Sequence, residues 1–286
     1  MQRANPSGID NDTRRIDRVQ LGAVSGVDSG TRGTYYLDAF ESRRQTYIGP
    51  VGGGSLPTPT HTPTTGPSPT PTNTPGSSDL IFSDGFESGT LSAWTASATD
   101  GGDLSVNAAA ALFGTNGLQA VIDDTNSMYL TDDTPNAEPR YRARFYFDPN
   151  SVTMSSGAAH FLFRGFAGSS TQVIRVEFRF SSGAYQIRAA LTNDGSTWSN
   201  TSWFTISDAP HSVEFDWQAS AGPGANNGSV SLWIDGAQLA SLGGIDNDTR
   251  RVDRVRLGAV AGLDAGTSGT YFFDAFESRR QSYIGP

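Results

Sequence analysis

The sequence predicts an all-β fold, and three observations support that prediction. The chain of 286 residues is 36% hydrophobic and 10% aromatic, which is enough apolar material for at least one sizeable core. Its 33 Gly and 15 Pro punctuate many short elements rather than a few long helices. Apolar and polar residues also alternate with a period of two over several short segments, as they do in half-buried strands.

Turn signals separate the alternating segments. An Asp or Asn followed by Gly favours the left-handed backbone conformations of the tight turns that join antiparallel strands. Pairs of this kind stand at Asp84-Gly85, Asp194-Gly195, Asn227-Gly228 and Asp235-Gly236.

The alternation assigns one side of each predicted strand to a core and the other side to solvent. The outward positions are rich in Arg, Glu and Asp, so we expect a mixed-charge sheet face on which opposite charges pair across neighbouring strands. The inward positions are Tyr141, Ala143, Phe145, Phe147, Ile174, Val176, Phe178, Phe180, Val213, Phe215, Trp217, Val230, Leu232, Ile234, Val255 and Leu257, and the outward charged positions are Arg142, Arg144, Arg175, Glu177, Arg179, Glu214, Asp216, Arg254 and Arg256.

Composition excludes several classes of protein. The formal net charge of -9 opposes binding to a phosphate backbone, so we predict no nucleic-acid partner. The absence of Cys rules out disulfides and thiolate metal sites. We also predict neither a membrane span nor a signal peptide, because no apolar run is long enough and the first residues contain no apolar signal core. If the protein is secreted, its signal lies outside this segment.

An internal repeat is the most specific feature of the sequence. Residues 8–50 and 244–286 are identical at 34 of 43 positions, at a constant offset of 236. The changes exchange similar apolar residues, such as Ile16 for Val252, or small and polar ones. We therefore predict that residues 1–50 are the C-terminal strands of a preceding sandwich repeat, and that residues 79–286 form a complete repeat.

Between the two copies, residues 51–78 form a Pro/Thr-rich segment that cannot pack a core. Pro at this density predicts a semi-rigid polyproline II linker. Ser and Thr interspersed with Pro are typical of O-glycosylated stalks, which makes the linker hydroxyls candidate glycosylation sites, although a bare linker has the same composition. The candidates are Thr58, Thr60, Thr62, Thr64, Thr65, Ser68, Thr70, Thr72 and Thr74.

Several stretches within residues 79–286 carry a resemblance to a known family. Residues 82–94 read FSDGFESGTLSAW, residues 211–217 read HSVEFDW, residues 228–236 read GSVSLWIDG, and residues 271–276 read YFFDAF. They resemble laminin G-like domains of the concanavalin A-like jelly-roll superfamily, here in a bacterial extracellular tandem-repeat protein. The resemblance implies a two-sheet antiparallel jelly-roll sandwich. The first and last stretches also resemble carbohydrate-binding jelly rolls of the galactose-binding type, which are two-sheet sandwiches as well.

The same superfamily includes glucanases, whose signature is a strand with Glu-x-Asp-x-(x)-Glu. Glu214 and Asp216 begin that pattern, but Ala219 stands where the second Glu would close it. Glu177 on another predicted strand is the one alternative partner. The His residues have no spacing that suits a metal site or a catalytic triad. We predict that the protein is not an enzyme.

A structural Ca2+ ion is implied by the resemblance, because jelly rolls of both types often hold one near their joined first and last strands. The candidate ligands are Asp84, Glu87 and Asp274, by likeness to the Phe-Glu and Phe-Asp strand motifs. Residues 246–248, Asp-Asn-Asp, form a second acidic turn, which ordinary turn chemistry explains equally well.

Two functions remain open. The first is a non-catalytic structural repeat of an extracellular or cell-surface filament, which propagates head-to-tail with other copies of itself as partners. Residues 8–50 support it, because they duplicate strands that residues 244–286 supply to their own domain and need another copy for completion. The second is a carbohydrate-binding module array of a secreted protein. Its weak sugar-stacking candidates are Trp198, Trp203 and Trp233, although Trp is often merely half-buried at a sandwich edge.

Overall fold

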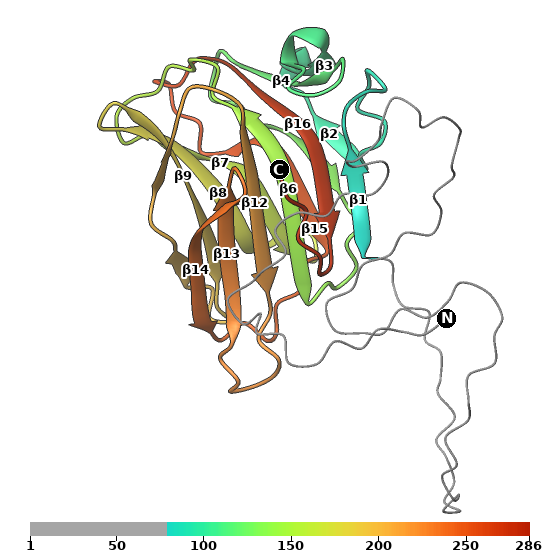
Figure 1. Cartoon of the computed structure of the whole chain (residues 1–286), viewed down its shortest axis with the longest axis vertical. Coiled ribbons are helices and arrows are strands. Elements are labelled where there is room, and N and C mark those ends of the chain that lie inside the picture. Colours follow the sequence, from blue (N-terminus) through green and yellow to red (C-terminus); the bar gives the residue numbers. More distant parts are fainter. Residues whose placement is uncertain (1–78) are drawn as a thin grey trace, which may run out of the picture. The chain divides into compact units, whose positions relative to one another are not determined.

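The alternating segments form the strands of two antiparallel sheets that pack face to face (Figure 1). The computed structural model describes residues 79–286. The predictions made for residues 1–78, which include the strands of a preceding repeat, the polyproline II linker and its glycosylated hydroxyls, lie outside the described residues. Two short 3-10 helices, η1 (Asp100–Gly102) and η2 (Ala108–Ala110), interrupt the strands. No helix in this part of the chain is long and apolar enough to cross a membrane.

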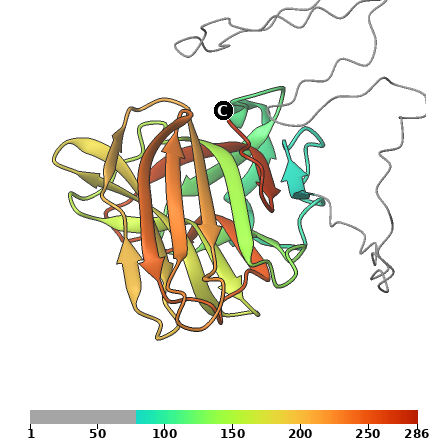
Figure 2. The same cartoon turned by 60° about the horizontal axis from the view of Figure 1, so that its bottom comes forward.

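The first sheet, sheet A, contains the two strands that the HSVEFDW and GSVSLWIDG stretches form. These two strands pair antiparallel, as the resemblance implies, and Figure 2 shows them beside β14. In spatial order, sheet A consists of β14 (Ala237–Ile245), β13 (Gly228–Ile234), β12 (His211–Gln218), β6 (Arg140–Asp148), β16 (Gly269–Arg279), β4 (Gly117–Ile122) and β3 (Leu104–Asn107), with β1 (Leu80–Asp84) paired to β16.

The second sheet, sheet B, covers the other side of the core. In spatial order it consists of β10 (Trp198–Asn200), β9 (Ala184–Thr192), β8 (Thr171–Ser181), β7 (Ala159–Ala167), β15 (Arg254–Ala261), β5 (Met128–Asp132) and β2 (Ala96–Ala98), with β11 (Phe204–Ile206) paired to β9. All pairings in both sheets are antiparallel, so the domain is the predicted two-sheet jelly-roll sandwich.

The inward positions predicted from the alternation form the core between the sheets. All of them are buried except Phe180, which is partly buried at the end of β8. Aromatic rings from both sheets meet there. For example, the centre of the Phe163 ring of sheet B lies 4.8 Å from the centre of the Phe215 ring of sheet A. Packing of these large side chains supplies the main stabilisation, since no described residue offers a disulfide.

The C-terminal part of the domain contributes one central strand to each sheet. β15 lies between β5 and β7 in sheet B, and β16 lies between β4 and β6 in sheet A while also pairing with β1. Residues 254–279 are therefore central strands rather than an edge addition. A jelly roll without them would lose ladder partners in both layers.

The first residue of the domain is bound to residues 280–282, which follow the last strand. The carboxylate of Asp79 accepts hydrogen bonds from the backbone amides of Gln281 and Ser282, at 2.7 and 3.2 Å. The amide of Arg280 donates to the carbonyl of Asp79 at 2.8 Å. Together with the β1–β16 pairing, these bonds fix the start of the domain against its end.

A tight turn joins β13 to β14 where the sequence predicts one. Asp235 and Gly236 have φ angles of 52° and 76°, which is the left-handed pair of a type I′ hairpin turn. The Asp235 carboxylate accepts a hydrogen bond from the amide of Ser212 on β12 at 2.9 Å. The turn chemistry thus fixes the register of the three strands β12, β13 and β14.

Candidate functional site

The outward charged residues lie on two faces, which corrects the prediction of a single mixed-charge face. Those of β6 and β12, such as Arg142 and Glu214, belong to sheet A, whereas those of β8 and β15, such as Arg175 and Arg256, belong to sheet B. The period of two assigns a side to each residue but does not say which sheet a strand joins. The two sets therefore point away from each other on opposite sides of the sandwich.

On the outer face of sheet A, opposite charges stand in register. Arg142 pairs across the ladder with Asp216, and Arg144 pairs with Glu214. The Arg142 guanidinium contacts Glu214 at 2.7 Å and Asp216 at 2.6 Å, and Arg140 contacts Asp216 at 2.6 Å. Each of these arginines therefore has a carboxylate partner on the same face, although the Nε atoms of Arg142 and Arg144 are buried without one.

The C-terminal residues cover this network. The backbone amides of Ile284 and Gly285 donate to the two oxygens of Glu214, at 3.1 and 2.9 Å. The Tyr283 ring lies 5.9 Å from that of Trp233 on β13, and the Arg142 guanidinium lies over both rings. As a result Glu214 is only 1% exposed and is held by donors on several sides.

These contacts bear on the partial glucanase pattern. Glu214, its first carboxylate, is bound to Arg142 and two amides, and the alternative partner Glu177 lies on β8 of the opposite sheet. Two carboxylates on opposite faces of a sandwich cannot flank one glycosidic bond. The pattern therefore has no closing Glu, because Ala219 stands in its place and Glu177 lies on the other sheet.

On the outer face of sheet B, three arginines stand directly beside one another. Arg175 on β8 is in register with Arg164 on β7, and Arg164 is in register with Arg256 on β15. Neighbouring strands are about 4.8 Å apart, so this places like charges side by side across three strands. We refer to Arg175, Arg164 and Arg256 as the arginine row. Beyond Arg256 the register continues to Thr131 on β5.

Aromatic rings lie against the guanidinium groups of the arginine row. The Arg256 guanidinium lies 4.3 Å from the centre of the Tyr129 ring, and that of Arg164 lies 4.1 Å from Phe161. The Arg175 guanidinium lies 3.8 Å from the ring of Trp198. Stacking uses the flat faces of the guanidinium groups, so the terminal Nη donors of Arg164 and Arg256 remain available to another partner, whereas their Nε atoms are buried.

The row is only partly neutralised. Glu177 pairs with Arg175 at 2.7 Å and with Arg188 at 2.8 Å. Neither Arg164 nor Arg256 has an ion pair or hydrogen bond among the described residues, and the Nε atom of each is buried without a partner. Burial first, and then the charges of Arg175 and Arg256, lower the pKa of Arg164 to about 10.

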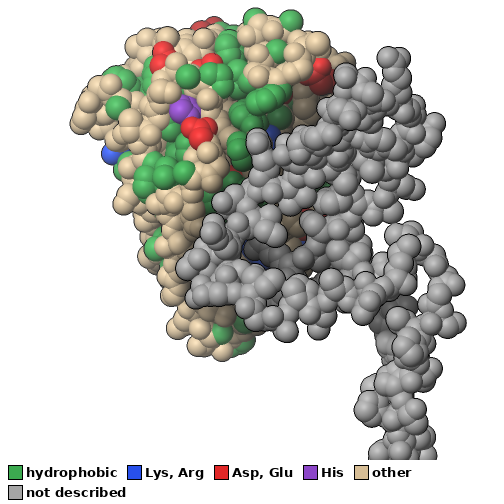
Figure 3. All heavy atoms as spheres, in the orientation of Figure 1, with side chains coloured by type: hydrophobic (Ala, Val, Ile, Leu, Met, Phe, Trp, Pro, Cys, Tyr) green, Lys and Arg blue, Asp and Glu red, His purple; other side chains and the backbone are tan. Residues whose placement is uncertain are grey.

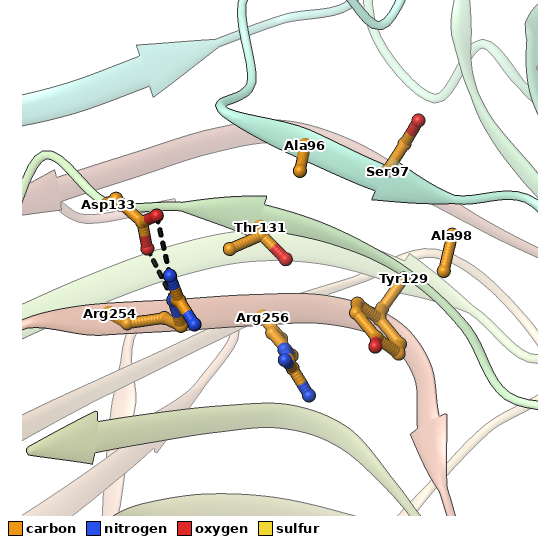
Figure 4. A pocket seen from close by; sticks show the side chains of 8 residues that line it. All are labelled: Ala96, Ser97, Ala98, Tyr129, Thr131, Asp133, Arg254 and Arg256. Atoms are coloured by element: carbon orange, nitrogen blue, oxygen red, sulfur yellow. Dashed lines mark hydrogen bonds and ion pairs between the residues drawn. The ribbon is translucent and has the colours of Figure 1, made fainter. Parts of the chain in front are cut away.

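A shallow pocket of about 210 Å³ opens at the Arg256 end of the row (Figure 4). Its floor is formed by β2 and β5, and Arg254 closes one side through a two-point contact with Asp133 at 2.5 and 2.8 Å. The pocket is lined by Ala96, Ser97, Ala98, Tyr129, Thr131, Asp133, Arg254 and Arg256.

The three predicted sugar-stacking tryptophans do not share a surface. Trp198 lies on β10 of sheet B, Trp203 lies in the loop between β10 and β11 against arginines of sheet B, and Trp233 lies on β13 of sheet A. Each is half-buried and carries a guanidinium against its ring, with Arg179 and Arg188 at 4.1 and 4.3 Å from Trp203. Arginine therefore occupies ring surface that a sugar would need.

The arginine row itself escaped the sequence analysis, because β7 does not show a clear alternation. Its segment, residues 159–167, reads AHFLFRGFA, with apolar residues on both sides of Arg164. The signal that could have found it is the isolated charge within an aromatic run, since burying an unpaired Arg is costly. The alternation did identify Arg175 and Arg256.

The predicted calcium ligands each bind nearby donors. The Asp84 carboxylate accepts from the Phe86 amide and the Trp94 indole at 2.8 and 2.9 Å. The Glu87 carboxylate accepts from the hydroxyl of Thr115 at 2.7 Å and from its amide at 3.0 Å, and these bonds lower the pKa of Glu87.

Asp274 lies at a bulge in β16, where Ala275 has a φ of 45°. Its carboxylate accepts from the amides of Leu112 and Phe113 at 2.9 and 2.8 Å, while burial raises its pKa. Asp84, Glu87 and Asp274 do not form a group of mutually close ligand atoms among the described residues. Calcium at these three residues stays a prediction.

The second acidic turn gathers a further carboxylate from a distant loop. Asp194 joins Asp246 and Asp248, with one oxygen of each within 4.8 Å of the others. Asp194 also accepts from the Thr249 amide, and Asn247 turns inward, where its side-chain oxygen accepts from the Ser220 amide at 2.7 Å. Burial and the two neighbouring carboxylates raise the pKa of Asp248.

The fold defines the class of this protein as a two-sheet antiparallel jelly-roll sandwich. No family model matches the chain, and no curated protein matches it. Among solved structures, the globular domain of T. cruzi calreticulin is similar with a TM-score of 0.49 and 12% identity, over 71% of this chain and 88% of that chain. The receptor-binding domain of botulinum neurotoxin C/D mosaic serotype is similar with a TM-score of 0.45 and 12% identity, over 64% of this chain and 42% of that chain.

Proposed function

We propose that the chain is a non-catalytic structural repeat of an extracellular or cell-surface filament. One observation carries the proposal. Residues 244–286, which include β15 and β16, are central strands of both sheets, and residues 8–50 repeat them at 34 of 43 positions. In residues 79–286 the place for these strands is already filled by the domain's own segment.

Residues 8–50 therefore need a second acceptor. Strands of this composition leave unpaired backbone groups and apolar side chains when they have no sheet to join. The matching acceptor is a segment equivalent to residues 79–243 of another copy, reached either within one long polypeptide or by exchange between chains. Both routes link copies head to tail, which is the geometry of an open filament.

Complementation tests this proposal. A tagged full chain co-expressed with an untagged fragment of residues 79–243 offers that fragment the central strands it lacks. We expect a 1:1 complex by native mass spectrometry. The matched control is a tagged chain that begins at residue 51, which keeps the linker and domain but has no spare strands. Failure of the full chain to retain the fragment, or equal retention by the control, would overturn the proposal.

The proposal includes an extracellular location and O-linked sugars on the linker hydroxyls. The support is compositional, because Pro at the density of residues 51–78 favours an extended polyproline II backbone, and Ser and Thr with Pro are typical of O-glycosylated stalks. Peptide mass spectrometry of the native protein should show hexose or N-acetylhexosamine additions across this segment. An unmodified peptide mass would contradict this part of the proposal.

A second candidate function, a carbohydrate-binding module array, is favoured by the outer face of sheet B. Arg164 and Arg256 have no hydrogen-bond or ion-pair partner among the described residues, whereas the C-terminal residues bind Glu214 on sheet A. Binding to a glycan array that disappears on Trp198→Ala or Trp233→Ala would favour stacking of sugars on these rings. Loss through arginine substitutions instead points to the ligand argued in the next section.

A further inference from the structure

The arginine row opposes the stability of the folded domain. Like charges directly opposite one another on neighbouring strands are destabilising, and Arg164 has such a neighbour on both sides. Its lowered pKa reflects the same repulsion together with burial. The chain has an excess of carboxylates, with a net charge of -9, yet Glu177 and Asp133 act on Arg164 and Arg256 only at longer range and form no direct ion pair with them.

The surroundings of the row hold its donors in place. Each guanidinium lies against at least one ring, and Arg256 lies over both Tyr129 and Phe166, at 4.3 and 5.1 Å. A side chain fixed in this way loses little further freedom on binding, and a planar guanidinium matches the two oxygens of a carboxylate or sulfate group. The row is therefore prepared for anions placed one after another.

We propose that the outer face of sheet B binds an acidic polysaccharide, whose carboxylate or sulfate groups lie along Arg175, Arg164 and Arg256. A linear polymer with regularly spaced anions fits a straight row that crosses several strands. A hydroxyl group of the same polymer has a partner at the Arg256 end, where Thr131 lines the pocket (Figure 4). This inference deepens the carbohydrate-binding candidate and does not depend on the filament.

Charge and shape favour a polysaccharide over other acidic partners. The acidic groups that a second copy of the domain would offer include the cluster of Asp194, Asp246 and Asp248, which is compact rather than linear. The bases of a nucleic acid need free ring faces to stack on, and the rings beside the row are already covered by guanidinium groups. A glycan carries its anions on hydroxyl-rich rings, which suit the polar surroundings of the row.

The duplicated segment offers an internal comparison. At the offset of 236 residues, Arg254 corresponds to Arg18, but Arg256 corresponds to Gln20. The substitution Arg256→Gln therefore introduces a residue that already occurs at the equivalent position of a closely similar segment. It should leave the fold intact while removing one end of the row.

Binding of the full chain to three polymers tests the proposal. Sodium polygalacturonate supplies carboxylates, dextran sulfate supplies sulfates, and dextran is the neutral control. By isothermal titration calorimetry we expect at least one acidic polymer to bind, more weakly as salt increases, and dextran not to bind. Arg164→Gln and Arg256→Gln should each lower the affinity about tenfold, since each removes a charged hydrogen-bonding partner.

The matched control is Arg144→Gln, on the outer face of sheet A. It removes the same charge from the chain but lies on the opposite side of the sandwich, so it should leave the affinity unchanged. Failure of both acidic polymers to bind, or an equal loss in the Arg144 variant, would overturn the proposal. A change in sedimentation mass on Arg164→Gln without polymer binding would overturn it in favour of a second copy as the partner.

Discussion

The arginines on the two outer faces of the sandwich have opposite surroundings. On sheet A, Arg142 lies opposite Asp216, contacts Glu214, and is covered by the C-terminal residues. On sheet B, Arg164 lies between two other arginines and has no ionic partner among the described residues. On the visible face of the domain in Figure 3, where grey atoms do not cover it, Arg atoms are sparse.

This difference separates charges that hold the fold from charges that are available to a ligand. A buried arginine with ionic partners is structural, because its removal leaves uncompensated partners. An arginine held beside like charges contributes repulsion instead, which an external anion would relieve. The following predictions test that distinction, from the largest expected effect to the smallest.

Breaking the sheet A network should have the largest effect. Glu214→Ala removes one of the two carboxylates bound to Arg142 and leaves the amides of Ile284 and Gly285 without an acceptor, in a site where Arg142 is 5% exposed. We expect the free energy of unfolding in urea to fall by about 3–5 kcal/mol. The double variant Arg142→Leu with Glu214→Leu should recover much of this loss, because it leaves no unpaired charge. If Glu214→Ala lowered the free energy of unfolding less than Arg164→Gln does, the comparison between the two faces would be wrong.

Acid should reveal a core contribution that belongs to neither face. His160 lies on the inner side of β7, 1% exposed between Phe178 and Tyr271, and burial lowers its pKa from 6.5 to about 4. The folded protein therefore keeps this His neutral while the unfolded chain protonates it. Stability is lost as pH falls from 6.5 to about 4, by about 3 kcal/mol in total.

The variant His160→Phe should remove this component. The readout is the difference between its pH profile of unfolding and that of the original chain, because buried acids such as Asp274 titrate in the opposite sense. Their raised pKa values favour the folded state as pH falls. Identical pH profiles for the two proteins would assign the acid sensitivity to groups other than His160.

Calcium should stabilise the domain if the predicted ion binds. A ligand that binds only the folded state adds about 2.7 kcal/mol at a hundredfold excess over its dissociation constant. The measurement is the shift in melting temperature between EDTA and excess calcium, compared for Asp274→Asn and Asp246→Asn. Loss of the shift only in Asp274→Asn supports the loops beside sheet A, and loss only in Asp246→Asn supports the second acidic turn. If calcium did not shift the melting temperature of the original chain, the calcium prediction would be wrong. The carboxylates would then have only the observed amide and indole donors as partners.

The smallest effect should have the opposite sign. Arg164→Gln removes like-charge repulsion from the arginine row, so without a polymer it should raise the free energy of unfolding by about 0.5 kcal/mol. Thermal unfolding in low salt measures this gain, and high salt should reduce it. A destabilised variant would show that stacking on Phe161 outweighs the repulsion and that the row is part of the structural framework.

Several parts of the fold could be predicted from the sequence. The alternation in β6, β8, β12, β13 and β15 identified the core, because burial on one side of a strand leaves a period of two. The Asp235-Gly236 pair indicated its turn through backbone chemistry alone. The sheet to which each strand belongs could not be derived in this way, since it depends on contacts between residues far apart in the chain.

The candidate site could be predicted from the sequence only in part. Arg175 and Arg256 were identified as outward charges, but their alignment with Arg164 follows from the register of β7, β8 and β15. Local pattern contains no information on that register. The bulge that turns Asp274 toward the amides of Leu112 and Phe113 is likewise set by tertiary contacts.

The joined ends of the domain determine how it would respond to a pulling force. In an array of repeats, tension acts on the domain at Asp79 and beyond Pro286, and these ends are held together by the Asp79 bonds to Gln281 and Ser282. The amides bound to Glu214 and the ring on Trp233 would detach first. β1 would then separate from β16 beginning at the Leu80–Arg279 pair, one bond after another, because the strands are antiparallel and are loaded at the same end. Such peeling needs less force than shearing all the bonds at once, so each repeat would act as an extensible element that lengthens before the rest of the sandwich opens.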